Sequence, residues 1–340
     1  MSTADRLREL RATLERLPSV RLTHEPTPLE RCENLSQALG GIDLWIKRDD
    51  CTGLAFGGNK TRQLEFTLGD AVDQGCDAIV QGSSSQSNHC RQAAAACAKL
   101  GLHCHLVLSR DAHAGEVQGN ILLDQLLGAT IEFVDAQLGP ELEAAKQAAG
   151  DRLREQGRNP YVISGRRGKS RSAAGLFRGT LELAEQLEAR GVAPDYLYVC
   201  SAGATVCGIA LALRALGHPY PIQAVAPIRW PYDVTESFVE TSNTLAEELG
   251  IDTRLTTGDI RFTEDYVGPD YGVLTSEARA AIELVARTEG ILLDPSYTGK
   301  AMAGLIDHVR RGLIEPGTTV VFVHTGGTPA LFAYAAELAR

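Results

Sequence analysis

The sequence contains six lysines, and one of them has neighbours that suit chemistry. Lys60 follows the Gly-Gly-Asn run 57–59 and directly precedes a helical pattern over 61–69. Glycines let the backbone approach a bulky planar ligand, and the positive end of a helix dipole disfavours a protonated lysine. An unprotonated amine is the form that makes a Schiff base. Lys60 is therefore the candidate nucleophile, whereas Lys99 and Lys146 lie within helical patterns and are expected to face solvent.

A nucleotide-binding P-loop is the competing interpretation of the same run. Gly53 lies ahead of Gly58, and Lys60 and Thr61 follow. Asn59 separates Gly58 from Lys60, which breaks the Gly-Lys-Thr register that aims a backbone loop and a lysine at phosphates. The chain also lacks a Gly-x-Gly-x-x-Gly run after a predicted strand and a Gly-x-Ser-x-Gly elbow. ATP, GTP and dinucleotide binding and serine-hydrolase chemistry are therefore disfavoured.

Three segments share the order apolar strand, small polar loop and helix. Their strands are expected at 77–81, 196–200 and 319–323, and their helices at 88–100, 207–216 and 329–338. Apolar strands that alternate with helices indicate a mainly parallel sheet covered on both faces. Each loop places free N–H groups and the positive end of a helix at the carboxyl edge of the sheet, where anions bind. With 340 residues, the sequence predicts an α/β protein of two lobes.

The composition narrows the classes of partner. The formal net charge of −10 opposes binding to nucleic acid and to anionic membranes. Residues 1–20 carry charges throughout and lack the apolar core of a signal peptide, and no apolar run approaches the ~20 residues that span a bilayer. None of the eight cysteines forms a Cys-x-x-Cys pair, so reduced buried thiols are favoured over a metal site. A cytoplasmic protein that acts on a small molecule is expected.

Three motifs together resemble one enzyme family. They are Gly-Gly-Asn-Lys-Thr-Arg at 57–62, Gln-Ser-Asn-His at 86–89 and Asp-Pro-Ser-Tyr-Thr-Gly-Lys at 294–300. Their residues and their order resemble those of the family of 1-aminocyclopropane-1-carboxylate (ACC) deaminase and D-cysteine desulfhydrase. The resemblance extends from about Pro26 to the last helix. The resemblance implies pyridoxal 5'-phosphate as cofactor and the tryptophan-synthase-β type of fold (fold type II). It also implies a large cofactor-binding domain of residues 1–54 plus 166–340, a small domain of residues 55–165, and a homodimer.

The resemblance implies a role for individual residues. Lys60 would carry the cofactor and move protons, Asn88 would bind the ring hydroxyl, and Ser87 would act as an acid, base or positioning group beside the substrate. The loop at 201–205 would hold the phosphate. The further residues implied are Tyr271 and Tyr297 as active-site tyrosines, Thr298 at the pyridine nitrogen, His89 at the substrate, and Ser201, Ala202, Gly203, Ala204 and Thr205 at the phosphate. For Ser87 a helix cap is an equally simple role, compatible with the functional one.

The residue at position 298 bears on the reaction. Ring-opening deaminases of this family resemble one another in having a glutamate there, which keeps the ring nitrogen protonated. Thr298 supplies no such charge, which favours β-elimination with a good leaving group. The predicted reaction removes the Cα proton of a small sulfur-containing amino acid, expels sulfur, and yields pyruvate and ammonia. D-cysteine is the leading substrate; ACC deaminase, an amino-acid racemase and a non-catalytic binding module on the same fold are the alternatives.

Two stretches depart from the family. Residues 83–85 are Ser-Ser-Ser where relatives usually have glycine and aliphatic residues. After the strand that ends at Ile163, relatives have a run that resembles Gly-Gly-Ser-Asn, whereas this chain has four cations within residues 166–171. If Arg166 and Arg167 face the cleft, the substrate carries a second anionic group, and L-cysteate, which would lose sulfite, becomes a candidate. The alternative for these cations is a solvated surface loop.

Overall fold

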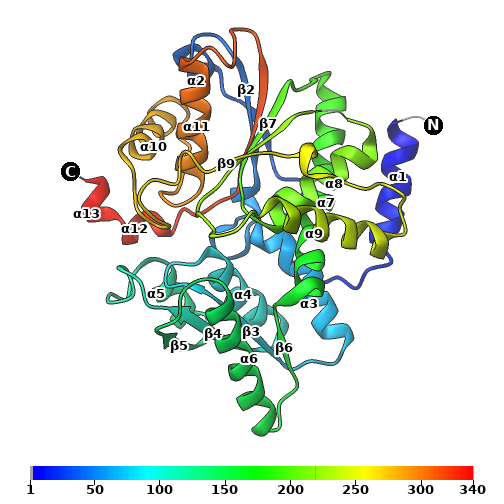
Figure 1. The fold of residues 1–340 in the computed structure, drawn as a ribbon, viewed down its shortest axis with the longest axis vertical. Coiled ribbons are helices and arrows are strands. Elements are labelled where there is room, and N and C mark those ends of the chain that lie inside the picture. The colour runs from blue at the N-terminus through cyan, green and yellow to red at the C-terminus, as the bar shows by residue number, and fades with distance from the viewer. Residues whose placement is uncertain (1–2, 219, 340) are drawn as a thin grey trace.

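The structure, a computed structural model, describes residues 3–218 and 220–339. The chain forms two lobes, each around its own sheet, and the sheet of the upper lobe in Figure 1 is the larger. In the larger sheet the strand order is β1-β2-β10-β7-β8-β9, and every pair is parallel except β1 with β2. In the smaller sheet the order is β5-β4-β3-β6, with all pairs parallel. The predicted α/β class with two mainly parallel sheets is confirmed.

The strands of each sheet are short, from three to seven residues. Those of the larger sheet are β1 (Leu29–Arg31), β2 (Asp43–Arg48), β7 (Tyr196–Cys200), β8 (Ile222–Val225), β9 (Arg261–Thr263) and β10 (Thr319–His324). Those of the smaller sheet are β3 (Ala78–Ser84), β4 (His103–Ser109), β5 (Thr130–Val134) and β6 (Pro160–Val162). The three strands predicted from the strand–loop–helix pattern correspond to β3, β7 and β10.

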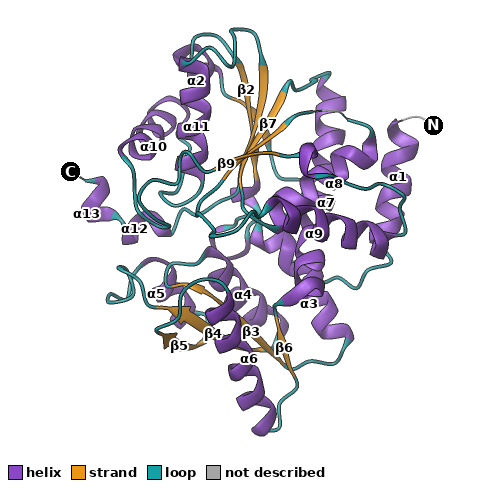
Figure 2. Ribbon diagram, in the orientation of Figure 1, coloured by secondary structure: helices purple, strands orange, loops and turns teal. Residues whose placement is uncertain are grey.

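Helices cover both faces of each sheet (Figure 2). The α-helices are α1 (Thr3–Leu14), α2 (Glu33–Ala38), α3 (Lys60–Asp73), α4 (Asn88–Leu100), α5 (Gly119–Leu126), α6 (Pro140–Glu155), α7 (Gly165–Arg190), α8 (Ala204–Leu216), α9 (Thr235–Leu249), α10 (Ser276–Glu289), α11 (Thr298–Arg310), α12 (Ala330–Ala333) and α13 (Ala335–Leu338). Short 3-10 turns lie at Asp49–Cys51, Leu54–Phe56 and Thr257–Asp259.

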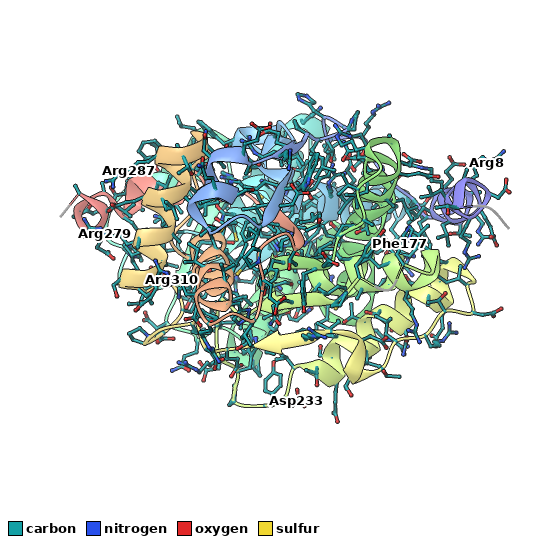
Figure 3. The ribbon with its side chains drawn as sticks, turned by 90° about the horizontal axis from the view of Figure 1, so that it is seen from above. Arg8, Phe177, Asp233, Arg279, Arg287 and Arg310 are labelled. Atoms are coloured by element: carbon teal, nitrogen blue, oxygen red, sulfur yellow. The ribbon has the colours of Figure 1, made fainter. Side chains whose placement is uncertain are left out.

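Each sheet separates two apolar cores. One face of the larger sheet packs against α1, α7, α8 and α9, and the other packs against α2, α10 and α11. Figure 3 shows Phe177 of α7 among the packed elements, whereas Arg8 and Arg287 lie on the outside. Phe177 is fully buried, and the side chain of Arg287 is 77% exposed. Burial of these apolar faces holds strands that are too short to be stable alone.

A buried ionic network ties α3 to the larger sheet and to α7. The guanidinium of Arg62 donates to Asp49 Oδ1 at 2.9 Å and to Glu182 Oε1 at 2.9 Å, and its side chain has no exposed surface. Lys47 also bonds to Glu182. Glycine allows the helices to approach this closely, because a β-carbon at Gly175 would lie 2.0 Å from the carbonyl oxygen of Arg62.

Some predicted elements differ from the observed ones. The helix expected over 329–338 divides into α12 and α13 at Tyr334, whose φ and ψ are −104° and 15°. The ring of Tyr334 is buried and its hydroxyl donates to the carbonyl of Gly272, which holds the chain at the break. Residues 166–171 are not a surface loop, because they form the start of α7. The boundaries at residues 54/55 and 165/166 stay a prediction.

Two classes of feature are missing from the described part of the chain. None of its helices combines the length and apolarity that crossing a membrane requires. Within residues 3–218 and 220–339, no cluster of three or more His, Cys, Asp or Glu side chains has the arrangement of a metal site. Cys90, Cys97 and Cys104 are buried free thiols.

Candidate active site

A cavity of about 770 Å³ lies where the two lobes meet. Elements from both sheets form its wall: the starts of α3, α4, α7 and α8, the end of β3, and α6. The carboxyl ends of parallel strands and the amino ends of the following helices therefore face a shared space, as the strand–loop–helix pattern predicts. The predicted site residues that line this cavity are Lys60, Ser87, Asn88, His89, Ser201, Ala202, Gly203, Ala204, Thr205, Tyr271 and Tyr297.

Lys60 is the first residue of α3 and lies on the cavity wall. Gly57 and Gly58 before it have φ values of 67° and 126°, and a β-carbon at Gly57 would lie 1.9 Å from the carbonyl oxygen of Asp50. Arg91 Nη2 donates to the Gly57 carbonyl at 2.8 Å, which fixes the loop to α4. Burial lowers the pKa of Lys60 to about 8. This amine therefore loses its proton more readily than an ordinary lysine does, as Schiff-base chemistry requires.

The loop at 201–205 presents hydrogen-bond donors to the cavity. It joins β7 to α8, and within the described chain the N–H groups of Ala202, Ala204 and Thr205 have no protein acceptor. Thr205 Oγ1 accepts from Asn59 Nδ2 at 2.9 Å and from Gln63 Nε2 at 3.0 Å. Because both amides donate to it, the Thr205 hydroxyl proton is left to donate elsewhere. This set of donors at the start of a helix suits an anion.

The segment 87–89 begins α4 on the opposite wall. Ser87 caps the helix by accepting from Cys90 N at 3.2 Å, so the capping role is confirmed. Asn88 Oδ1 accepts from Asn120 Nδ2 at 3.0 Å, which leaves its own amide group to donate. His89 Nε2 is buried and has no partner among the described residues. Burial, and then the charges of Lys60 and Lys146, hold the pKa of His89 well below its usual value, so the imidazole is neutral.

Two tyrosines form a short chain of hydroxyl groups. The hydroxyls of Tyr271 and Tyr297 lie 2.7 Å apart, and Ser84 Oγ lies 3.2 Å from the hydroxyl of Tyr271. Burial raises the pKa of Tyr271, whereas the hydrogen bonds from Ser84 and Tyr297 act in the opposite direction. Burial and the contact with Tyr271 raise the pKa of Tyr297 well above its usual value. Tyr297 therefore stays protonated as a donor. Ser84 belongs to the 83–85 run that departs from the family.

Thr298 does not have the position expected of it. It is fully buried and is absent from the cavity wall. Its hydroxyl donates to Asp294 Oδ1 and accepts from the N–H of Asp294, each at 2.7 Å, so Thr298 serves the turn that begins α11. Thr325, in the loop after β10, lines the cavity instead. Sequence reasoning placed this loop at the correct edge of the sheet but did not select Thr325.

Arg166 and Arg167 also lie away from the cavity wall. Both side chains are more than half exposed, at 60% and 57%. Arg166 Nε donates to Thr244 Oγ1 at 2.7 Å, and Arg167 Nε donates to Asp70 Oδ2 at 2.7 Å. The expectation that these two arginines bind substrate is therefore wrong, because local partners hold them on the outside of α7.

Lys146 is a wall residue that sequence reasoning missed. It was expected to face solvent, yet its side chain is only 3% exposed and lines the cavity. Its Nζ donates to the carbonyl of Ile163 at 2.7 Å and to Glu143 Oε1 at 2.6 Å. The helical periodicity around 140–155 gives no signal for this, because the burial depends on Ile163 and Gly82, which lie far from Lys146 in the sequence.

Comparison with known proteins agrees with this geometry. The sequence pattern of pyridoxal-phosphate dependent enzymes matches residues 20–326, which include most of the cavity wall. The chain belongs to this family. It is 40% identical to a D-cysteine desulfhydrase of Serratia proteamaculans, over 96% of this chain and 98% of that protein. A D-cysteine desulfhydrase of Klebsiella pneumoniae is 39% identical, with 94% and 97% covered.

Solved structures show the same architecture. An ACC deaminase homologue superposes with a TM-score of 0.89 at 35% identity, with 97% of this chain and 98% of that chain covered. A diaminopropionate ammonia lyase of Escherichia coli, 14% identical, has a TM-score of 0.69 over 96% of this chain and 88% of that chain, and shows the fold alone. The chain is a pyridoxal-phosphate dependent enzyme of fold type II.

The residues present fit pyridoxal phosphate. The unpaired N–H groups of the 201–205 loop and the hydroxyl of Thr205 match a phosphate group. Lys60 offers an amine of lowered pKa to the cofactor aldehyde, and Asn88 offers an amide donor to the ring hydroxyl. Thr325, rather than Thr298, offers a hydroxyl on the wall.

Substitution of Thr205 by valine is expected to weaken cofactor binding. The change removes the hydroxyl donor and leaves the amide groups of Asn59 and Gln63 without their acceptor. Loss of a hydrogen bond to a charged group costs about 1.5–3 kcal/mol, so the dissociation constant of pyridoxal phosphate should rise about 10- to 100-fold. Fluorescence titration of the apoenzyme measures it. A serine variant keeps the hydroxyl and should bind nearly as the native protein does; equal losses in both variants would contradict this role.

Proposed function

We propose that the enzyme is a lyase that eliminates sulfur from a small amino acid, with D-cysteine as the first substrate to test and pyruvate, ammonia and sulfide as products. One observation carries the proposal. The similarity to named D-cysteine desulfhydrases extends over 96% of this chain and 98% of the Serratia protein, so the two lobes and the cavity between them fall within the matched length.

Chemistry at Cα depends on Lys60. Bound pyridoxal phosphate supplies an aldehyde that links to an amino group and a conjugated ring that accepts electron density from Cα. Lys60, whose pKa burial lowers to about 8, would accept the Cα proton when its amine is free. The start of α4 at Ser87 and Asn88 binds the substrate carboxylate, because a helix amino end favours an anion.

Departure of the sulfur needs a proton donor or an acceptor of negative charge. Tyr297 lines the cavity, stays protonated, and is held by Tyr271 at 2.7 Å. We assign Tyr297 the role of donating a proton to the leaving sulfur, with Tyr271 and Ser84 orienting its hydroxyl. Glu143, on α6, is the one acidic side chain among the described residues of the wall, so the wall offers no other carboxylate that could protonate a ring nitrogen. This supports elimination over ring opening.

Substitution of Tyr297 by phenylalanine tests the donor role. We expect kcat/KM for D-cysteine to fall about 10²-fold, the lower end of the range for lost acid catalysis. A substrate whose leaving group needs no proton, β-chloroalanine, should lose less than about 5-fold, because chloride leaves unprotonated. Equal losses for the two substrates would refute proton donation. Cofactor absorbance confirms that the variant binds pyridoxal phosphate.

A panel of amino acids decides among the reactions. The purified enzyme is incubated with D- and L-cysteine and with ACC, and pyruvate, sulfide, ammonia and 2-oxobutyrate are measured. Sulfide and pyruvate from cysteine support the lyase. Release of 2-oxobutyrate from ACC would favour the deaminase, which the structural likeness to an ACC deaminase homologue keeps as the second candidate. Inversion of recovered substrate without pyruvate would indicate a racemase.

The resemblance also supports a homodimer, and we propose a cytoplasmic location with it. The division into residues 1–54 plus 166–340 and residues 55–165 is proposed on the same ground. β3 to β6 all fall within the second range.

A further inference from the structure

The segment between β9 and α10 carries an active-site tyrosine but has no regular structure of its own. It comprises residues 264–275, all of which the structure describes, and they form turns, bends and irregular backbone. We name it the Tyr271 segment, because Tyr271 within it lines the cavity. Backbone carbonyls outside helices and sheets need other donors. The side chains that supply these donors therefore decide where the Tyr271 hydroxyl lies.

Lys300 of α11 is a buried donor to this segment. Its Nζ donates to the carbonyl of Val267 at 2.6 Å and to the carbonyl of Asp270 at 3.3 Å, and the residue has no exposed surface. Asp270 directly precedes Tyr271, so the second bond holds the backbone next to the tyrosine. Lys300 is not among the residues that line the cavity, and the proposed function gives it no role although it completes the 294–300 motif.

One face of α11 makes further contacts with the Tyr271 segment. Lys300, Gly304 and Asp307 recur at steps of four and three residues, which places them on the same side of the helix. Tyr266, near the start of the segment, packs on this side. Its hydroxyl donates to Asp307 Oδ2 at 2.6 Å, and a β-carbon at Gly304 would lie 3.0 Å from its ring. The helix that begins directly after Tyr297 therefore also holds the segment that carries the second tyrosine.

This attachment sets the distance between the two tyrosine hydroxyls. Tyr271 and Tyr297 are 26 residues apart in the sequence, yet their hydroxyls lie 2.7 Å apart and their ring planes meet at 76°. A shift of about 1 Å in Tyr271 would lengthen this contact beyond the range of hydrogen bonds. A cation of α11 that binds the carbonyl of Asp270 opposes such a shift, because it joins the backbone beside one tyrosine to the helix that follows the other.

Other donors hold the two ends of the Tyr271 segment. The exposed side chain of Arg229 donates to the carbonyl of Gly268 at 2.7 Å and to that of Glu264 at 3.2 Å. The hydroxyl of Tyr334 donates to the carbonyl of Gly272. Water reaches the exposed guanidinium and can replace its bonds, whereas the buried ammonium of α11 has no such substitute. Loss of the ammonium therefore affects the segment more than loss of the guanidinium.

We propose that Lys300 is a positioning residue for the elimination. By binding the backbone beside Tyr271 it holds the Tyr271 hydroxyl against that of Tyr297, and so aims the Tyr297 proton at the leaving sulfur. This rests on the proposed function, in which Tyr297 donates that proton. The Cβ–S bond breaks with its electron pair on sulfur, and sulfur takes the proton of Tyr297. Lys300 is not on the cavity wall and transfers no proton itself.

The leaving group distinguishes positioning from general damage. In Lys300→Met, kcat/KM for D-cysteine should fall about 10- to 100-fold, as expected when a catalytic group moves by about 1 Å. The value for β-chloroalanine should fall less than about 3-fold, because chloride leaves without a proton. Added to Tyr297→Phe, the same change should cost less than about 3-fold more, because the donor that it serves is already absent. Lys99→Met, which changes an exposed lysine of α4, is the matched control and should change neither substrate.

Hydrogen exchange tests the attachment without any reaction. Amides of the Tyr271 segment should exchange about 10-fold faster in Lys300→Met than in the native enzyme, whereas those of α8 should keep the native rate. Arg229→Met changes an exposed residue that poses little risk to folding, and should give the same selective loss and faster exchange by smaller factors. Equal losses toward D-cysteine and β-chloroalanine, or unchanged exchange of the segment in both variants, would overturn the role of Lys300. Absence of pyruvate from every amino acid with the native enzyme would instead overturn the proposed function.

Discussion

Replacing Lys60 with alanine is expected to lower kcat/KM for the preferred substrate about 10³- to 10⁴-fold and to abolish covalent retention of pyridoxal phosphate. Lys60 supplies both the amine that links the cofactor and the base for Cα, so one substitution removes two functions. Borohydride reduction followed by peptide mass spectrometry should find the cofactor on Lys60 in the native protein and on no peptide of the variant.

The pKa of Lys60 gives this prediction a second measurement. Burial lowers that pKa to about 8, so the fraction of free amine rises as the pH increases through this value. The rate at which apoenzyme takes up pyridoxal phosphate should therefore rise with pH and level off above about 9. Lys99→Ala is the matched control. Normal covalent loading of the Lys60→Ala variant would show that another lysine is the cofactor anchor.

Replacing Arg62 with methionine should lower the free energy of unfolding by about 3–5 kcal/mol, the usual cost of removing one partner from a buried ion network. Arg62 has no exposed surface and bonds to both Asp49 and Glu182 at 2.9 Å, so the substitution leaves these carboxylates facing each other without their shared cation. Urea unfolding of the apoenzyme measures the loss. Arg166→Met removes an exposed cation, and should cost less than about 1 kcal/mol.

The same network predicts a dependence of stability on pH. Burial alone would raise the pKa of Glu182, but the charges of Arg62 and Lys47 outweigh it and lower the pKa to about 2. A carboxyl group whose pKa is lowered on folding stabilises the folded state above its unfolded value near 4.3, and this contribution is lost as the pH falls toward about 2. In Arg62→Met this acid limb should begin at higher pH. An unchanged limb would show that Arg62 does not set the Glu182 titration.

Local patterns in the sequence were sufficient for much of the fold. Strand β7 and helix α4 have the predicted bounds because each combines an apolar run or a helical pattern with a clear start signal, and Ser87 caps α4 as its residue type suggests. The loop before Lys60 could be predicted equally well, because Gly57 and Gly58 have positive φ values, which favour glycine. These features depend on residues close in sequence, which periodicity and capping describe well.

The errors concern contacts between distant residues. Arg167 was expected in the cleft, but Asp70, 97 residues away in sequence, holds it on the outer side. Thr298 matched a family position, yet its hydroxyl is used by Asp294 in its own turn. Lys146 is buried against Ile163 and Gly82, which no helical period reveals. Whether a polar side chain faces a cavity is decided by competing partners, and a single sequence does not show which partner is nearest.

The place of Lys146 on α6, apart from the cofactor contacts, has a consequence for how such an enzyme changes over time. Lys60 and Thr205 belong to α3 and α8, whereas Lys146 belongs to α6 and bonds only to Glu143 and Ile163 among described residues. Mutations in α6 can therefore change the charge and shape of this part of the wall while Lys60 and Thr205 stay in place. Directed evolution that aims to change the accepted substrate is best started in this helix.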